Sequence, residues 1–328
     1  MPFDIETYLN SLPEDTEEIN VSHRNLRFIP DLSRFKNLKI LNCSYNKLKR
    51  LPHLNDKLII LICFCNILVC LPVLNETLED LNCAYNKLTC LPKLNKNLKF
   101  LFCYNNQLSS LPDLNENLKQ LHCNYNNLTS LPPLNEKLEI LGCFQNMLSS
   151  LPPLNKNLKK IECMNNQLSW LPILNENLKE LECNNNKLTY LPPLNKNLKI
   201  LKCCFNILVC LPTLNEELEI LFCSWNELTY LPILNKKIFH LNFCENPIYK
   251  ILNNNELEIS RDFEKLNVNI KILNNFRYLY YLLKFRKQFW DWYFIKVKEP
   301  RIKEKYHPKY LLKNLDESTD LDELLNKW

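Results

Sequence analysis

The chain has 328 residues, of which 23% are charged and 46% hydrophobic, and its formal net charge is +5. This composition is typical of a folded protein and argues against disorder, while so small a charge excess does not by itself indicate nucleic-acid binding. No apolar run approaches the roughly 18 residues of a membrane-spanning helix, and the acidic N-terminus lacks the basic-then-apolar order of a signal peptide. We therefore expect a cytoplasmic protein with no membrane partner.

Residues 1–18 are the first predicted element. Phe3, Tyr8, Leu9 and Leu12 can lie together on a short helix. The periodic region that follows must cover its exposed first unit. We therefore expect residues 1–18 to form an N-terminal cap.

Residues 19–248 repeat a 20-residue unit about twelve times. One unit shows the pattern, with Leu61, Cys63, Asn66 and the pair Leu71-Pro72 at positions that recur along the chain. The first unit is irregular, since Arg24 replaces the Asn, as suits an edge. A fixed period of this length indicates a solenoid, because one unit cannot bury its apolar face alone and must stack on its neighbours.

Each unit predicts one coil. Leu61 and Cys63 alternate with outward-facing residues, which is typical of a short strand that pairs with the next coil in a parallel sheet. Asn66 is expected to turn the chain and to satisfy buried backbone groups with its side chain. Pro72 favours an extended, polyproline-like return segment, and Asn75 can cap a short turn before the next strand.

The stretch from Leu58 to Leu68 follows the pattern LxxLxCxxNxL and resembles the leucine-rich repeat family. The resemblance covers residues 19–248. It implies an α/β-type solenoid with short parallel strands on the concave face and an extended convex side. The 20-residue Leu-Pro type looks most like repeats of secreted bacterial effectors. Some of those carry a ubiquitin-ligase domain with a catalytic cysteine, but no cysteine follows Cys244 here, so that activity is not implied.

The residue bias and the chain end add a second resemblance. The chain is rich in Asn, Lys, Ile and Leu and has a single glycine, and the segments 305–312 and 321–328 are similar to tails of proteins from mimivirus-like giant viruses. This resemblance implies a viral protein in the cytoplasm of an infected host cell.

Ten of the sixteen cysteines occupy one repeat position: Cys43, Cys63, Cys83, Cys103, Cys123, Cys143, Cys163, Cys183, Cys203 and Cys223. A metal or redox role is one interpretation, but zinc needs four converging ligands, and a column presents its thiols in a line. Disulfides between neighbouring parallel strands have poor geometry. We predict that these cysteines are small core residues, and that the protein has no metal site and no cofactor.

Residues 249–328 are predicted to form a helical C-terminal cap or small domain packed on the last coils. The stretch 275–297 is dense in apolar and aromatic residues, and 13 basic but only 3 acidic residues lie between Lys265 and Lys313. One alternative is nucleic-acid binding through this basic segment, which the acidic residues after it disfavour. Another is an adaptor in which residues 249–328 recruit other machinery, such as machinery related to ubiquitin.

Enzyme signatures are sparse. Gly142 is the only glycine, which excludes a glycine-rich phosphate loop, and the five histidines have no metal-ligand spacing. His122 and Cys123 are adjacent but should face opposite sides of a strand. We predict a protein that is not an enzyme.

Aromatic residues mark the expected concave face, where they favour protein recognition. The alternative is that the rings only pack on one another along the sheet. Lys160, Glu162, Glu180 and Glu182 should form an acidic spot within this apolar surface. We predict a non-enzymatic scaffold that binds a protein partner through these residues: Phe64, Tyr85, Phe102, Tyr104, Tyr125, Phe144, Phe205, Phe222 and Trp225.

Overall fold

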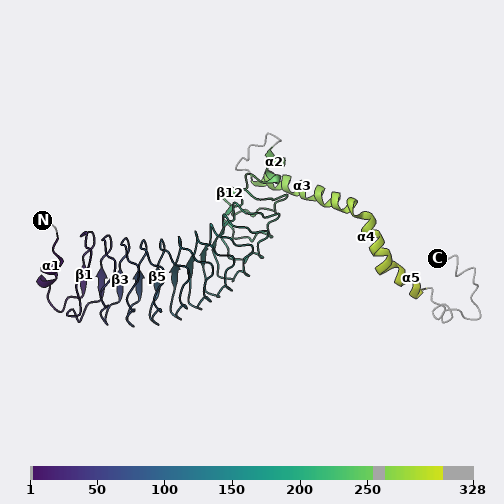
Figure 1. The fold of residues 1–328 in the computed structure, drawn as a ribbon. Coiled ribbons are helices and arrows are strands. Elements are labelled where there is room, and N and C mark those ends of the chain that lie inside the picture. Colours follow the sequence, from purple (N-terminus) through teal and green to yellow (C-terminus); the bar gives the residue numbers. More distant parts are fainter. Residues whose placement is uncertain (1–2, 254–262, 306–328) are drawn as a thin grey trace, which may run out of the picture. The chain divides into compact units, whose positions relative to one another are not determined.

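A computed structural model describes residues 3–253 and 263–305, which begin with helix α1 (Ile5–Ser11) and continue as a ladder of short strands (Figure 1). Each strand has three residues, and from β3 onward each begins 20 residues after the one before. The strands are β1 Glu18–Asn20, β2 Ile40–Asn42, β3 Ile60–Ile62, β4 Asp80–Asn82, β5 Phe100–Phe102, β6 Gln120–His122, β7 Ile140–Gly142, β8 Lys160–Glu162, β9 Glu180–Glu182, β10 Ile200–Lys202, β11 Ile220–Phe222 and β12 His240–Asn242.

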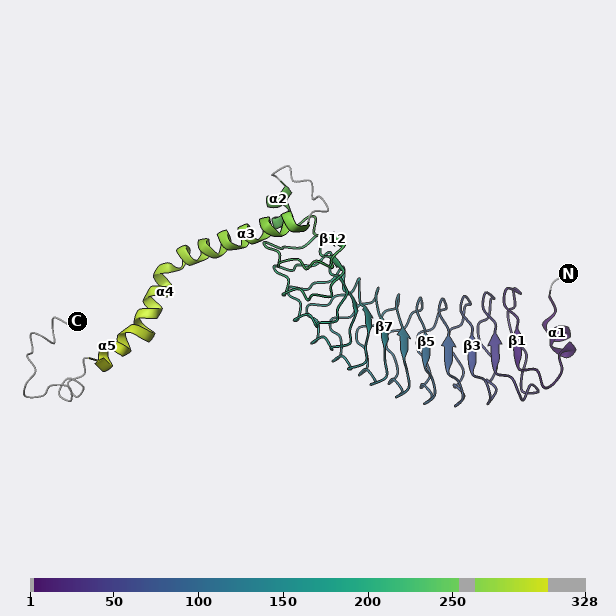
Figure 2. The ribbon, with the colours of Figure 1, turned by 180° about the vertical axis from the view of Figure 1, so that it is seen from behind.

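The twelve strands form one parallel sheet in sequence order, β1 to β12. The pairing keeps equivalent positions opposite each other, so that Leu61 lies between Leu41 and Leu81. In β2 to β11 the middle residue is buried, and outside β7 both flanking residues are half-buried. The strands follow one another along one side of the solenoid (Figures 1 and 2). The predicted parallel-strand solenoid with an extended return side is confirmed.

The core consists of columns of identical side chains. The ten cysteines of the repeat column have no exposed surface, and neither do neighbouring leucines such as Leu58, Leu61 and Leu68. Burial raises the pKa of Cys83, Cys123 and Cys163 to about 12, since a thiolate loses its hydration there. The predicted core position of these cysteines is confirmed.

The asparagine after each strand ties two coils together. The Asn66 side chain accepts a hydrogen bond from Leu48 N–H at 3.0 Å and donates to the carbonyls of Cys43 and Cys63 at 3.0 and 3.1 Å. The same pattern recurs in every coil up to Asn246. This column therefore satisfies backbone groups that the turn would otherwise leave buried and unpaired, as the sequence predicted.

The residue before this asparagine is left-handed in each coil, with φ between 51° and 55° from Tyr45 to Glu245. Glycine usually occupies such positions, and a larger residue loses about 1–2 kcal/mol there. The single glycine of the chain lies elsewhere, so that Tyr85, Tyr125 and Trp225 adopt this conformation. The hydrogen bonds of the adjacent asparagine hold the turn in place, and the left-handed residue stays at the surface.

A second asparagine column lies on the return side. Asn95 donates to the carbonyls of Asn75 and Leu78, at 2.5 and 3.0 Å, and accepts from the N–H groups of Asn97 and Leu98. The turn-capping role predicted for this column is therefore observed. It also joins neighbouring coils on the side that carries no strand.

Both ends of the repeat region carry a short helix. In α1, the Asp4 side chain caps the helix by accepting from Glu6 N–H, and Ile5 and Leu9 are buried. The first coil meets this helix through Arg34, which donates to the Leu9 carbonyl. After β12, helix α2 (Pro247–Asn253) buries Ile248 and Leu252.

The chain divides into two compact units, Met1–Asn267 and Val268–Trp328. Helix α3 (Phe263–Lys284) begins in the first unit, where the Asn267 side chain bonds to both backbone groups of Leu234 at 2.9 Å. Then follow α4 (Arg286–Tyr293), a π-helical turn (Phe294–Lys298) and α5 (Glu299–Lys305).

The helical character predicted for residues 249–328 is confirmed where the structure describes them. The packing of this segment on the last coils stays a prediction. The tail segments 306–312 and 321–328, and the acidic residues between them, lie outside the described residues.

Candidate partner-binding face

The concave face is built from four side-chain positions of each coil: the first and third residues of the strand and the two residues after the inward cysteine. In coil three these are Ile60, Ile62, Phe64 and Cys65, all half-buried. Because the strand period is two, the first three of these positions point away from the core column of Leu61 and Cys63. The fourth, Cys65, lies in the turn after the strand, where its left-handed backbone leaves it half-buried at the surface. The nine predicted partner-binding residues all occupy these positions.

From Ser44 to Phe144, side-chain size on this face repeats every two coils. Residues Ser44, Ala84 and Asn124 are small and buried, and the next residue in each case is an exposed tyrosine. The coils between them carry Phe64, Tyr104 and Phe144 at the position of the small residue. Over these six coils, the basic unit of the surface is therefore a pair of coils, 40 residues long.

Each of these three pairs of coils contributes one edge-to-face ring pair. The ring centroids of Tyr85 and Tyr104 are 5.4 Å apart, and those of Tyr125 and Phe144 are 5.2 Å apart. Phe64 makes the equivalent pair with Tyr45 at 4.9 Å. This geometry is favourable for aromatic rings, worth about 0.5–1.5 kcal/mol per pair. The tyrosine of each pair keeps nearly half of its surface exposed, so these rings pack on one another and still offer contact area.

The later coils also carry a pair of aromatic rings in contact, with other residues at these positions. Phe205 and Trp225 stack with their centroids 5.4 Å apart, and about half of each side chain is exposed. Phe222 in β11 lies between Lys202 and Asn242 in the sheet register and is half-buried. The nine predicted residues thus fall into an N-terminal set, from Phe64 to Phe144, and a C-terminal set, from Phe205 to Trp225.

The acidic spot predicted between the two sets is largely neutralised. Lys160 pairs with Glu162 at 2.9 Å and with Glu180 at 3.1 Å, while Lys202 pairs with Glu182 at 2.8 Å. The hydrogen bond that Lys160 donates to Glu162 is the main cause that raises the pKa of Lys160. Each of these carboxylates has a counter-ion within the sheet, so the middle of the face is an ion-pair network.

His122 belongs to the aromatic surface, although the sequence analysis considered it only as a possible catalytic residue beside Cys123. Its ring stacks on Phe102 at 5.1 Å, and burial is the main cause that lowers its pKa. The position next to it in the sheet is Gly142. Tyr45 and His23, which stack at 4.1 Å, also extend the face beyond the nine predicted residues. Both residues stand at repeat positions of the concave face, and this was the sequence signal that could have added them to the predicted set.

Replacing Gly142 with alanine should disturb this stack. The new Cβ would lie 2.8 Å from Asn124 Oδ1 and 2.9 Å from His122 Nδ1, so both side chains must move. We expect a loss of about 1 kcal/mol in the free energy of unfolding, measured by urea denaturation. Since the clash involves side-chain ends, the same change in a His122→Ala background should cost clearly less, and an equal cost would show that the ring is not the cause.

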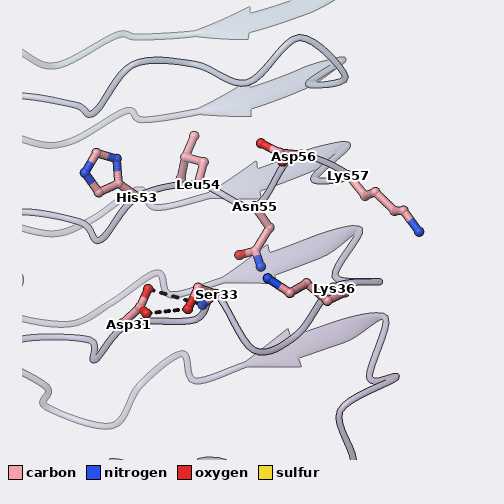
Figure 3. Close-up of a pocket in the computed structure, with 8 residues that line it drawn as sticks. All are labelled: Asp31, Ser33, Lys36, His53, Leu54, Asn55, Asp56 and Lys57. Carbon is pink, nitrogen blue, oxygen red and sulfur yellow. Dashed lines mark hydrogen bonds between the residues drawn. The ribbon is translucent and has the colours of Figure 1, made fainter.

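Among the described residues, the return side has a hollow near each end of the repeat region. The first, of about 350 Å³, is formed where the first coil is two residues longer, and its charged residues are exposed and of both signs (Figure 3). The Asp31 carboxylate there accepts from Ser33, which lowers its pKa. The second, of about 640 Å³, lies among the Leu-Pro segments between Tyr190 and Ile233. Neither hollow contains a converging set of catalytic groups.

Within residues 3–253 and 263–305, no group of three or more His, Cys, Asp or Glu side chains is arranged to hold a metal ion. The helices in these same ranges include none that is both long and apolar enough to cross a membrane.

Solved structures with the same fold are leucine-rich repeat proteins. The chain is similar to the leucine-rich effector YopM from Yersinia pestis, with 29% identity and a TM-score of 0.65 over 73% of this chain and 74% of that one. YopM from Yersinia enterocolitica gives 27% identity and a TM-score of 0.50 over 74% and 67%. InlJ from Listeria monocytogenes, whose solved domain includes a cysteine ladder, gives 23% and 0.51 over 71% and 64%.

No protein-family profile and no curated protein matches the chain. The parallel sheet, the 20-residue spacing and the solved neighbours together define a leucine-rich repeat solenoid with a helical C-terminal region.

Proposed function

We propose that this protein is a non-enzymatic scaffold that binds a protein partner through the concave face of its solenoid. The observation that carries the proposal is the series of ring pairs along the strands, in which Tyr85, Tyr125 and Trp225 each leave about half of the side chain exposed. Rigid aromatic rings of this kind provide most of the binding energy in many protein interfaces. The similarity to YopM, described as a leucine-rich effector, agrees with a binding role.

The aromatic rings of the concave face are preorganised for binding. They project from a sheet whose turns are fixed by the asparagine column, so that little conformational entropy is lost when a partner docks. The ion-pair network around Lys160 separates two apolar sets. We propose that the partner contacts the N-terminal set, from Phe64 to Phe144, and the C-terminal set, from Phe205 to Trp225, and bridges the network between them.

The cellular setting is part of the proposal. We propose that the protein acts in the cytoplasm of a host cell infected by a giant virus. The similarity of its composition and tail segments to proteins of such viruses supports this setting, and sixteen free thiols are compatible with a reducing compartment.

Substitution of the exposed rings tests the binding face. Tyr85→Ser combined with Trp225→Ser should weaken capture of the partner at least about tenfold, since each buried ring contributes 2 kcal/mol or more at an interface hot spot. Partners are first identified by crosslinking in cells, and affinity is then measured with the purified partner. The control is Ile173→Ser, which removes a side chain that is 83% exposed outside the concave face. Equal affinities of the two variants would contradict the proposal.

A further inference from the structure

The concave face changes character at β4. This coil presents three small or polar residues, here called the Asp80 row: Asp80, Asn82 and Ala84. The coils on both sides present large apolar side chains at the same positions: Ile60, Ile62 and Phe64 on one side, and Phe100, Phe102 and Tyr104 on the other. Strands in a sheet lie about 4.8 Å apart, so the two apolar rows are separated by about 9.6 Å, with smaller side chains between them.

Asp80 is the charged member of this row and is half-buried. Its in-register neighbours, Ile60 and Phe100, are apolar, and burial raises the pKa of its carboxyl. Within the part of the chain that the structure describes, no ion pair involves Asp80. Lys99, the residue before Phe100 in the neighbouring coil, is engaged with Glu79 at 2.7 Å.

The carboxylates in the middle of the face differ from Asp80, because they are paired with lysines. There, Glu162, Glu180 and Glu182 each have a lysine within 3.1 Å. Asp80 is thus a partly desolvated carboxylate. The free-energy cost of removing water from its charge is not offset by a counter-ion among the described residues. The first and third positions of β2 to β12 carry four carboxylates and two lysines, a net charge of −2 with the histidines neutral, whereas the whole chain has +5. This face therefore complements a basic partner.

We propose that the Asp80 row receives an arginine side chain of the protein partner, with its guanidinium on the Asp80 carboxylate. This inference rests on the proposed function of the concave face and specifies the partner's chemistry. An arginine has an apolar stem that can lie between Ile62 and Phe102, and a cationic end for Asp80. A guanidinium binds a carboxylate through two parallel hydrogen bonds and also stacks on aromatic rings such as Phe100. Lysine offers neither the fork nor the plane.

The test uses small probes, because the partner is not identified. N-acetyl-arginine amide is titrated into the full-length protein, and the methyl resonances of Ile60 and Ile62 are followed by NMR. N-acetyl-citrulline amide has nearly the same shape without the charge and serves as the neutral probe. We expect saturable shifts with the arginine probe and an affinity at least about tenfold lower for citrulline, since a hydrogen bond to a charged group contributes about 1.5–3 kcal/mol.

Asp80→Asn is the decisive variant. It keeps the shape of the side chain, should remove the preference for arginine over citrulline, and should leave the protein at least as stable as before because a desolvated charge is gone. The matched control is Asp113→Asn, which changes an exposed aspartate on the return side. Equal binding of both probes, an unchanged preference in Asp80→Asn, or tighter binding of N-acetyl-lysine amide would overturn the assignment.

The outcome can be separated from that of the proposed function. If Tyr85→Ser with Trp225→Ser abolishes partner capture while Asp80→Asn leaves it unchanged, the face binds a partner but the arginine assignment is wrong. If the arginine probe binds at Asp80 and the double variant still captures the partner, the row is a cation site and the aromatic proposal fails.

Discussion

Replacing Asn126 with alanine should destabilise the protein by about 3 kcal/mol. The side chain accepts from Leu108 N–H at 2.9 Å and donates to the carbonyls of Cys103, Cys123 and Asn124 at 3.1 Å. The carbonyls of Cys103 and Cys123 retain other asparagine donors, but Leu108 N–H would be left buried and unpaired. An orphaned buried group costs about 1–3 kcal/mol, and the lost hydrogen bonds add to this cost. Urea denaturation followed by circular dichroism measures the change.

Asn127 provides a matched control for this prediction. It is the next residue of the same turn, has the same side chain and is exposed, so Asn127→Ala should change the free energy of unfolding by less than about 0.5 kcal/mol. Asn126→Asp should fall between the two, because a carboxylate can still accept from Leu108 N–H but cannot donate to carbonyls. Equal stabilities of Asn126→Ala and Asn127→Ala would refute the proposed role of the asparagine column.

In the native protein, iodoacetamide should label Cys70 and Cys90 and leave the ten column cysteines unmodified. Both of the former are exposed, whereas the column thiols have no exposed surface. Burial also raises the pKa of thiols such as Cys123 to about 12, which lowers the thiolate fraction at neutral pH by a factor of about 1,000 relative to an ordinary cysteine. Peptide mass spectrometry after timed labelling measures the modification at each site.

Labelling in denaturant is the control for the cysteine experiment, since all sixteen thiols should then react. Full modification of the column in the native state would contradict the buried column. So would stoichiometric zinc in the purified protein, measured by elemental analysis, because a line of buried thiols does not supply four converging ligands.

The repeat positions predicted much of the fold because their physical roles are local and recur in each coil. Leu61 and Cys63 have the period of a strand, Asn66 has the polar groups that a tight turn needs, and Pro72 disfavours a helix on the return side. The predicted short helix near the N-terminus is observed as Ile5–Ser11. The same alternation located five of the nine candidate residues on the strand side, and the other four, Tyr85, Tyr125, Phe205 and Trp225, were located by the repeat position that follows. Their role in binding is untested.

The sequence was less informative where the outcome depends on neighbours. Lys160 has the same repeat position as Asp80, yet its carboxylate partners lie on its own strand and on the next one, while Asp80 lies between apolar residues. For this reason, the sequence predicted an acidic spot but did not predict that lysines would neutralise most of its charge. Likewise, Gly142 was noted only for its rarity, and its effect on His122 arises from contact between adjacent strands.

The amino-acid sequence by itself determined the stacking of the coils, the buried cysteine column and the side of the sheet on which the aromatic residues lie, because a 20-residue period repeats the same local choice in each coil. Only the tertiary structure decided which rings pair, which carboxylates are neutralised and which one stays without a counter-ion. Those features depend on distances of 3 to 6 Å between side chains of different coils, and such distances are set by the register of the sheet and the rotamers that fit it.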